Sequence, residues 1–385
     1  DLCPFDLRQR FFTSFRMTKK LMKLSVHLVT WNGEKYIPHL FESLKKQSYA
    51  DWTLLVIDNN SGDGTVELIK KESSNFLVKW KLIENKTNLG FAGGHNQAFR
   101  ESESEYVLLL NQDMYLAPDC LEKVVMFLDQ HPEAASVSPR LMKWDFPANF
   151  TEQIDALGLK VYRSRRVVEQ YTQQNWSDLK KIICHCEERS DEAIPRFGSA
   201  NRGIAALPLV ARNDSLEVFG VSGALPALRR SAIKNVAYPD GSIFDESYHS
   251  YKEDVDLAWR LAVNGQKSYV LLDAVAYHDR SAAGPKQADD ASALANKKQQ
   301  SEWVKYHSYK NHLMTLYKNE YWQNFALDFP WILWYELKKF VYFLLFDRHI
   351  LGGLKEIFNK DLAKKRRLIK SFRKISWQEM RKWWP

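Results

Sequence analysis

The sequence predicts an α/β protein whose sheet is largely parallel and is covered by helices on both faces. Short apolar runs alternate along the chain with segments in which apolar residues recur every three or four positions, and this alternation is typical of strand–helix repeats. The chain has 385 residues, of which 45% are hydrophobic. It can therefore bury the core of one large domain with an appendage, or of two domains.

The first half of the chain contains four expected strands, each followed by a helix. Each strand is a short apolar run, and each helix has an apolar face at helical spacing. The expected strands lie at residues 24–30, 52–57, 77–83 and 106–110. The expected helices lie at about residues 36–44, 66–69, 95–100 and 121–128.

Polar side chains follow three of these strands. Thr30 and Asn32 come after the first, Asp58 ends the second, and Asn111 and Asp113 follow the fourth. Each of them alone is a plausible turn residue. Because ligands of open α/β sheets bind beyond the carboxyl ends of the strands, their common placement indicates a nucleotide site.

A glycine-rich stretch, NLGFAGG, follows Asn88 and contains Gly90. It lacks both the GxGxxG spacing of a dinucleotide fold and the GK[ST] ending of a P-loop. Its glycines could still bring backbone amides close to a ligand. The small residues of FGVSGA, at 219–224, offer a similar close approach or simply a tight packing turn.

An acidic triplet, Glu253, Asp254 and Asp256, opens a helical pattern in the second half of the chain. Carboxylates are favoured in a first helical turn by the helix dipole. A short apolar strand at 269–272 follows, and then His278. A carboxylate on the helix and a histidine one strand later can also converge on one site, as a base and a metal ligand.

Seven motifs occur in one order along the chain: VTWN, IDNNSGDGT, NLGFAGGHNQAF, LLLNQD, FGVSGA, YKEDVDLAWRL and AYH. This ordered set resembles the family-2 glycosyltransferases of the GT-A fold, and most of all the branch with bacterial rhamnosyltransferases. The resemblance covers residues 23–280 apart from one insert. It implies a Rossmann-like mixed sheet flanked by helices. It also implies an inverting glycosyltransferase that moves a sugar from a dTDP- or UDP-sugar to a cell-surface glycan or lipid-linked acceptor. Rhamnose is the first sugar that the resemblance suggests.

The resemblance also implies roles for individual residues, with Mg²⁺ or Mn²⁺ as the cofactor. Asp254 would be the general base, with Glu253 beside it, and Asp113 and His278 would hold the metal. The first position of the usual DxD metal motif is Asn111 here, which leaves one carboxylate in the motif. The nucleotide-sugar would be bound by Thr30, Asn32, Asp58, Asn88, Gly90 and Asn111, and the acceptor side would be formed by Ser222, Gly223 and Asp256.

Three segments are expected to lie outside the catalytic core. Residues 1–22 are an N-terminal extension, with Met17 as a candidate native start. Residues 183–214 resemble the translation of a mobile palindromic repeat, and we expect a disordered, dispensable insert whose Cys184-His185-Cys186 run is not a metal site. Residues 281–298 form a flexible loop, as either a lid over the donor or a plain linker.

The last region, 299–385, is expected to be helical, aromatic and basic. From residue 348 onward it has twelve Lys/Arg against three Asp/Glu, whereas the rest of the chain is nearly neutral. Charged residues interrupt its apolar run, which argues against a membrane-spanning helix. It suits an anionic membrane surface, or a helical hairpin packed on the catalytic domain, or both. No disulfide framework is evident, so we expect a cytoplasmic protein, peripheral on the inner face of the cell membrane.

Other classes of function fit the sequence less well. A non-catalytic nucleotide-sugar-binding or scaffolding protein of the same fold is the main alternative. A nucleotidyltransferase would need a glycine-rich, basic loop after the first strand, where this chain has WNGEKYIPHL. The neutral body argues against a nucleic-acid partner.

Overall fold

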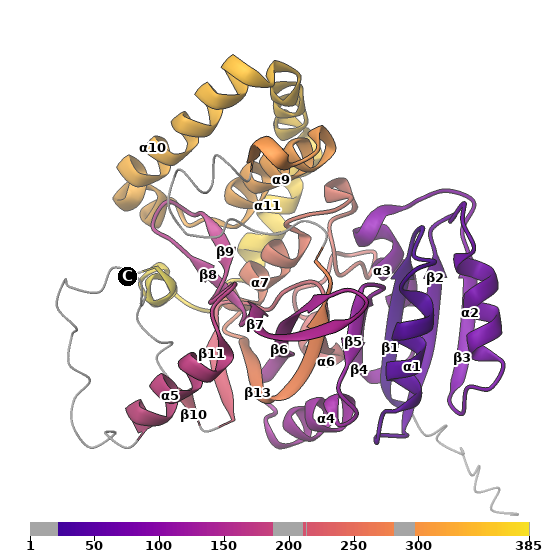
Figure 1. Cartoon of the computed structure of the whole chain (residues 1–385). Coiled ribbons are helices and arrows are strands. Elements are labelled where there is room, and N and C mark those ends of the chain that lie inside the picture. Colours follow the sequence, from indigo (N-terminus) through magenta and orange to yellow (C-terminus); the bar gives the residue numbers. More distant parts are fainter. Residues whose placement is uncertain (1–21, 188–210, 213, 281–296, 385) are drawn as a thin grey trace, which may run out of the picture.

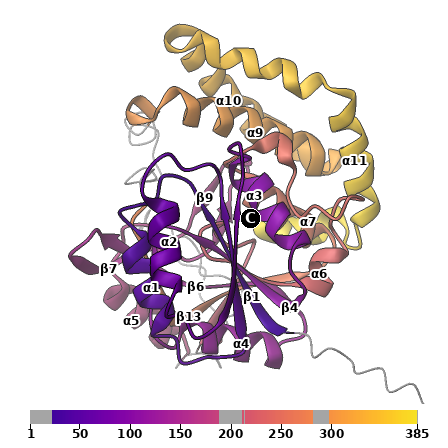
Figure 2. The same cartoon turned by 90° about the vertical axis from the view of Figure 1, so that its right-hand side faces the viewer.

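The fold is built on one mixed sheet with helices on both faces (Figures 1 and 2). The computed structural model describes residues 22–187, 211–212, 214–280 and 297–384. Within them the strands run in the order β10-β11-β13-β6-β12-β4-β1-β2-β3, with β5 beside β13 and β7 beside β6. The predicted α/β class and the mixed sheet implied by the resemblance are both confirmed.

The strands of the main sheet are β1 (Met22–Thr30), β2 (Trp52–Asp58), β3 (Lys79–Glu84), β4 (Ser104–Asn111), β5 (Met114–Leu116), β6 (Ala134–Asp145), β7 (Asn149–Ala156), β10 (Ala211–Arg212), β11 (Ser215–Val218), β12 (Ala227–Arg229) and β13 (Lys267–His278). A separate hairpin joins β8 (Leu159–Val161) to β9 (Val167–Glu169). The helices around the sheet are α1 (Ile37–Lys45), α2 (Thr65–Ser73), α3 (Gly90–Arg100), α4 (Cys120–Gln130), α5 (Trp176–Glu187), α6 (Arg230–Lys234), η1 (Glu246–Tyr248) and α7 (Glu253–Val263).

Strand β4 shows how the sequence pattern builds the two layers. Its residues alternate in direction, as a strand requires. Tyr106, Leu108 and Leu110 pack with α1 and α4 in one core, whereas Val107 and Leu109 pack with α3, α6 and α7 in another. All five side chains are buried, and this continuous apolar run is typical of a strand covered on both faces.

The second half of the sheet contains two features that the apolar runs did not predict. The short antiparallel strand β12 lies between β4 and β6. Strand β13 extends to His278, well beyond the predicted 269–272. Asp273 interrupts its apolar pattern, and the register against β6 shifts between Leu271 and Val275. An irregularity of this kind hides a long strand from a periodicity argument.

Two other expectations about local structure were wrong. Helix α3 begins at Gly90, not near His95, so most of the glycine-rich stretch is helical. The glycines permit close packing there, because a Cβ at Gly94 would lie 2.8 Å from Val29. Residues 140–176, where no strand was predicted, contain the end of β6 and the strands β7, β8 and β9.

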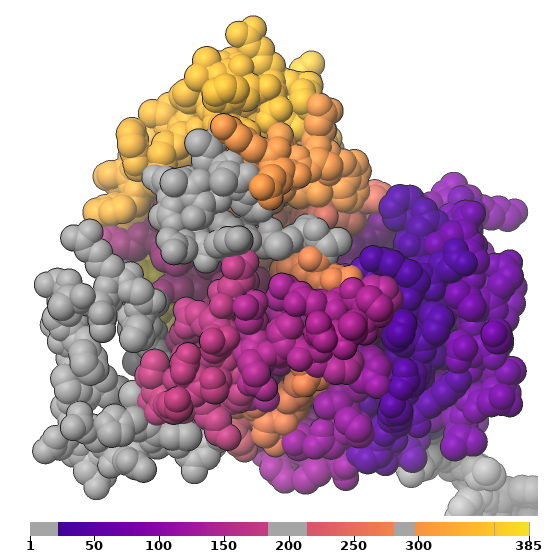
Figure 3. All heavy atoms as spheres, viewed as in Figure 1, coloured from indigo at the N-terminus to yellow at the C-terminus, as the bar shows by residue number. Residues whose placement is uncertain are grey.

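The C-terminal helices form a lobe on one side of the sheet domain (Figure 3). They are α9 (Glu302–Asn319), α10 (Trp322–Phe346), η2 (Arg348–Phe358), α11 (Lys360–Phe372), α12 (Trp377–Met380) and η3 (Arg381–Trp383). Helix α9 packs on α7 and α11. In the part of the chain that the structure describes, no helix is long and apolar enough to cross a membrane.

Three segments were predicted to lie outside the core. Most of their residues, 1–21, 188–210, 213 and 281–296, are not among the described residues. What is described at their edges is ordered. Met22 opens β1, residues 183–187 end α5, and Ala211–Arg212 pair with β11. The predicted insert therefore begins within α5, and its last described residues form β10 and the turn before β11.

Candidate functional site

The polar strand ends predicted from the sequence meet at one edge of the sheet. Thr30 is paired with Asp58 in the parallel register of β1 and β2, and Val29 is paired with Asn111 in that of β1 and β4. The Thr30 hydroxyl donates to Oε1 of Gln112 at 2.6 Å. Gln112 was not predicted, although it stands in the NQD motif, and its amide joins the ends of β1 and β4.

The loops after β1 and β2 are held together by side chain–backbone hydrogen bonds. Asp58 is buried and accepts from the backbone N–H (3.0 Å) and hydroxyl of Ser61. Asn32, at φ 50°, accepts from the backbone N–H of Gly62 at 2.8 Å and donates its own N–H to Ser61 Oγ at 3.0 Å. These hydrogen bonds fix the two loops at the strand-end edge of the sheet.

Gly90 has a backbone conformation that only glycine adopts at low cost, with φ +71°. Asn88 Oδ1 accepts its N–H at 2.8 Å. A Cβ at Gly90 would lie 2.5 Å from the carbonyl oxygen of His249. The start of α3 therefore lies directly against the loop that precedes α7.

Asp113 and His278 are brought together by the pairing of β5 with β13. His278 Nε2 lies 3.3 Å from Asp113 Oδ2, and its Nδ1 lies 2.8 Å from Asp155 Oδ2. Burial would lower the pKa of His278, but Asp113 and Asp155 raise it to about 9. Arg280 contacts Asp155 at 2.9 Å and Glu169 at 3.2 Å. A continuous chain of ion pairs thus runs from β5 to β9.

The pKa of Asp155 is lowered to about 2, because Arg280 and His278 outweigh the effect of burial. Asp155 therefore stays ionised and fixes the ring of His278 through Nδ1. This is the arrangement that orients a metal-ligating histidine in many proteins. Neither Asp155 nor Glu169 was predicted, because both lie within residues 140–176, where no strand was predicted, and neither belongs to a motif.

Asp113 and His278 fit a divalent cation only in part. Within residues 22–280 and 297–384, apart from the gaps noted above, no group of three or more His, Cys, Asp and Glu side chains could hold a metal ion. Asp113 supplies one oxygen ligand and His278 one nitrogen, and Mg²⁺ and Mn²⁺ take further oxygens, typically from phosphates. The donor set therefore suits a metal that is completed by a substrate diphosphate.

Asp254 stands at the start of α7 and faces the segment 222–224. The backbone N–H of Gly223 donates to Asp254 Oδ2 at 3.1 Å, and the N–H of Val255 donates to Oδ1 at 2.7 Å. Ser222 bonds to Glu169. Burial and the adjacent Asp254 raise the pKa of Glu253 well above its usual range. Burial thus favours the neutral form of Glu253, beside the more open Asp254.

The loop before α7 is strained. His249, Tyr251 and Lys252 all have positive φ, between 60° and 70°, which costs of order 1–3 kcal/mol for each such residue. The buried Asn311 of α9 offsets this cost. Its Nδ2 donates to the carbonyls of Tyr248, Ser250 and Tyr251 at 2.9, 2.9 and 2.8 Å.

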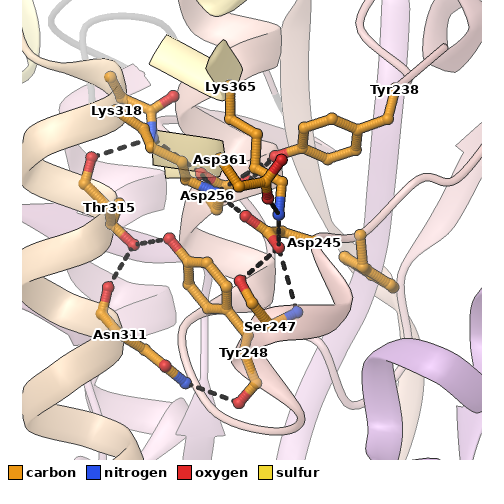
Figure 4. A network of polar contacts seen from close by, with 12 residues as sticks. Tyr238, Asp245, Ser247, Tyr248, Asp256, Asn311, Thr315, Lys318, Asp361 and Lys365 are labelled. Atoms are coloured by element: carbon orange, nitrogen blue, oxygen red, sulfur yellow. Dashed lines mark hydrogen bonds and ion pairs between the residues drawn. The ribbon is translucent and has the colours of Figure 1, made fainter. Parts of the chain in front are cut away.

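Asp256 lies in a different environment from the other predicted site residues. Its carboxylate contacts Arg260 and Lys318, each at 3.0 Å, and Asn319 at 2.8 Å, all of them buried. Figure 4 shows Lys318 of α9 between Asp256 and Asp245. The structure does not bring the Asp256 carboxylate to Ser222 and Gly223, and its contacts are those of a buried ionic network.

The topology is that of the GT-A fold. The crystal structure of GalNAc-T7 with UDP, GalNAc and Mn²⁺ has this fold in common with the chain, with a TM-score of 0.51 at 11% identity, over 78% of this chain and 48% of that one. Residues 25–189 match the model of Glycosyl transferase family 2.

Two relatives are similar in sequence over part of the chain. EpsE of Bacillus subtilis, whose own assignment as a glycosyltransferase is provisional, is 32% identical over 123 residues, which is 32% of this chain and 44% of EpsE. The poly(ribitol-phosphate) β-N-acetylglucosaminyltransferase TarS of Staphylococcus aureus is 34% identical over 114 residues, 29% of this chain and 20% of TarS. The chain thus matches less than half of the length of each relative.

Proposed function

We propose that the protein transfers a sugar from a nucleotide-sugar donor to a hydroxyl acceptor with inversion at the anomeric carbon. The observation that carries this proposal is the geometry around Asp254. Its carboxylate is fixed by the Gly223 amide, and the chain Asp113–His278–Asp155–Arg280–Glu169 leads to Glu169, which contacts Ser222 beside that amide. The base and the pair Asp113–His278 would then act on opposite sides of the anomeric carbon, the base on the acceptor hydroxyl and the pair on the leaving diphosphate.

In this proposal Asp254 accepts the proton of the acceptor hydroxyl, while the oxygen of that hydroxyl bonds to the anomeric carbon. The bond from that carbon to the diphosphate breaks, and the nucleoside diphosphate leaves with the electron pair. Glu253 is held neutral and does not compete for the proton. A bound Mg²⁺ or Mn²⁺ would neutralise the leaving diphosphate, with Asp113 and His278 as the residues that hold it.

The donor follows from the resemblance and remains part of the proposal. A dTDP- or UDP-sugar would bind along Thr30, Asn32, Asp58, Asn88, Gly90 and Asn111, with dTDP-rhamnose as the first to test. GalNAc-T7 was crystallised with UDP and Mn²⁺, and TarS is named for GlcNAc transfer. Both proteins support a nucleotide sugar as the donor. The identity of the sugar has to be determined by experiment.

The direct test is a panel of dTDP- and UDP-sugars with and without Mn²⁺, using wild type, Asp254→Asn and the control Asp145→Asn. We expect one donor to be turned over, and we expect Asp254→Asn to lower the rate by roughly 10²–10⁴-fold, the range for a general base. Asp145 is a half-exposed surface partner of Lys143, so its variant should keep the wild-type rate. Donor binding without turnover in all three proteins would favour the non-catalytic alternative.

We also infer that the C-terminal lobe rests on an anionic membrane surface. Helix α10 exposes a broad apolar face that includes Trp322, Leu327, Trp334, Leu345 and Phe346. The basic residues exposed after it include Lys355, Lys360, Lys364, Arg367 and Lys370. An apolar helix face together with cationic side chains is the combination that binds the lipid interface.

Vesicle flotation tests this docking. The protein should float with phosphatidylglycerol-containing vesicles, less with pure phosphatidylcholine, and less again in high salt. The double variant Trp322→Ala/Phe346→Ala should reduce flotation, whereas Leu77→Ala, at a fully exposed position in the sheet domain, should not. A concentration-dependent dimer that ignores both kinds of vesicle would instead assign the apolar face to a second copy of the chain.

A further inference from the structure

A cavity of about 400 Å³ lies between the β8–β9 hairpin and helix α10 (Figure 1). Its volume is in the range of pockets that hold small molecules. Four of the residues that line it are spaced three or four positions apart, and thus share one face of α10: Trp331, Trp334, Tyr335 and Lys338. The loop of the hairpin contributes Tyr162, Ser164 and Arg166.

The two walls of the cavity are held in place by buried ion pairs and by the turn of the hairpin. Asp328 of α10 is buried, and its carboxylate contacts Arg163 at 2.9 Å and Arg165 at 3.1 Å. Within the turn, the N–H of Arg165 donates to the Tyr162 carbonyl at 2.7 Å, and the N–H of Tyr162 donates to the Arg166 carbonyl at 2.9 Å. The cavity is therefore preformed, which lowers the cost of ordering its walls around a ligand.

The cations beside the cavity are already engaged within the protein. Arg166 and Lys338 each have an interaction partner, and Lys339 is paired with Glu336 at 3.3 Å. An anion would have to compete with these partners for the same side chains. A neutral ligand does not, so the charges around the cavity favour a neutral occupant over an anion.

The cavity combines exposed indole rings with hydroxyl groups. Trp334 is 62% exposed and Trp331 is 46% exposed, and the guanidinium of Arg163, 3.7 Å from the ring centroid, fixes the indole of Trp331. Tyr162 and Ser164 supply hydroxyls, which can both donate and accept. An apolar chain would use the rings alone. A sugar ring uses both, because its C–H face packs on an aromatic ring while its hydroxyls need hydrogen-bond partners.

The hairpin connects this cavity to the candidate site. About 10 Å of strand β9 lead from the hairpin turn to Glu169, which contacts Ser222. Lys252, close to Asp254 in the chain, donates to the Val167 carbonyl at 3.4 Å. The cavity therefore lies toward the acceptor side of Asp254, where a further sugar unit of an acceptor glycan would reach it.

We propose that this cavity is an acceptor subsite for a neutral glycan, in which one sugar ring packs on Trp334 and its hydroxyls bond to Tyr162 and Ser164. The acceptor is then an oligosaccharide whose reacting hydroxyl lies at Asp254, in a different sugar unit. This inference rests on the proposed glycosyltransferase function and deepens it, because it assigns the chemical class of the acceptor.

Binding is measured without a donor, by ligand-observed NMR titration. The neutral probes are maltose and the methyl glycosides of rhamnose, glucose and N-acetylglucosamine. Octanol represents an apolar chain, and inorganic phosphate represents an anion. The variants are Trp334→Ala and the conservative Trp334→Phe. The matched control is Trp322→Ala, which removes an exposed indole of α10 that does not line the cavity. Thermal melting confirms that each variant is folded.

We expect at least one neutral sugar to bind wild type, and we expect Trp334→Ala to weaken that binding by about 10-fold, the factor that one good aromatic contact supplies. Trp334→Phe keeps a ring and should retain most of the affinity, and Trp322→Ala should match wild type. Three results overturn the proposal. They are no sugar binding to wild type, unchanged sugar binding in Trp334→Ala, and tighter binding of octanol or phosphate than of every sugar.

Vesicle flotation of Trp334→Ala separates this subsite from the docking of α10 on a membrane. Wild-type flotation together with weakened sugar binding supports the subsite. Lost flotation together with wild-type sugar binding assigns Trp334 to the lipid interface instead, and overturns the subsite.

Hydrolysis of the nucleotide sugar without an acceptor is followed in the same proteins. Donor turnover by wild type without any sugar binding overturns the subsite and leaves the proposed function standing. Sugar binding that depends on Trp334, without turnover of any donor, supports a glycan site and contradicts the proposed function.

Discussion

Two networks of ion pairs lie close to α7, and they differ in how far their side chains are exposed to solvent. The buried network joins Asp245 and Asp256 to Lys318, with Arg260 and Lys365 as further partners. The site network joins Asp113, His278, Asp155, Arg280 and Glu169. In the first, Lys318, Asp245 and Asp256 are almost completely buried, whereas in the second Asp113 and Arg280 retain exposure.

This difference shows that a dense charge cluster does not by itself mark a site. Lys318 comes from α9 and its two carboxylate partners from the sheet domain, so the buried network attaches the C-terminal lobe to the segment that carries Asp254. The network at the strand ends holds side chains beside an open edge. The buried network should therefore govern stability, and the site network and Asp254 should govern activity.

The largest effect is expected for Lys318→Met, which removes the central cation and leaves two buried carboxylates. Removal of one partner from a buried pair typically costs about 3–5 kcal/mol. We expect a loss of this order in the free energy of unfolding, measured with urea, while the surface control Lys370→Met changes it by less than about 0.5 kcal/mol. A near-wild-type Lys318→Met protein would mean that the network is not a structural attachment.

Asn311→Ala tests a residue that belongs to α9 yet acts on the site. Without its amide, the strained loop 248–252 should relax and shift Asp254. We expect a fall in kcat of about 10-fold, which corresponds to about 1.4 kcal/mol, with donor affinity within about 3-fold of wild type. The exposed Asn149→Ala variant is the control. Two results would show that Asn311 is only structural. One is a loss of donor affinity as large as the loss of kcat, and the other is a lowered melting temperature with unchanged kcat.

The smallest effect concerns pH. Lys318 and Lys365 outweigh burial and hold the pKa of Asp245 well below its usual range. A depressed folded-state pKa stabilises the protein above the unfolded-state pKa of about 3.9, and this contribution is lost as the pH falls below that value. The difference in free energy of unfolding between wild type and Asp245→Asn should therefore be constant from pH 7 to about 5 and shrink toward pH 3. A difference that does not change with pH would contradict the ionised state.

Much of the fold was predictable because its signals are local. The apolar runs and helical faces between residues 24 and 128 predicted the order of strands and helices, and strand alternation in β4 follows directly from its sequence. The polar residues Thr30, Asp58, Asn111 and Asp113 were also accessible, because parallel strands place their carboxyl ends at one edge. Short or irregular strands have no clear period. The sequence therefore did not predict strand β12, the full length of β13 or the strands within 140–176.

The sequence by itself determined which residues carry charge and the order of the first strands and helices, but not which charges meet. Asp254 and Asp256 are two positions apart on one helix, and about 100° per residue turns one toward Gly223 and the other toward Lys318. Asp155 and His278 are 123 residues apart and meet only because β7 and β13 both pair with β6. Sheet register and helix packing decide these encounters, because partners so distant along the chain are brought together only when the whole core is formed.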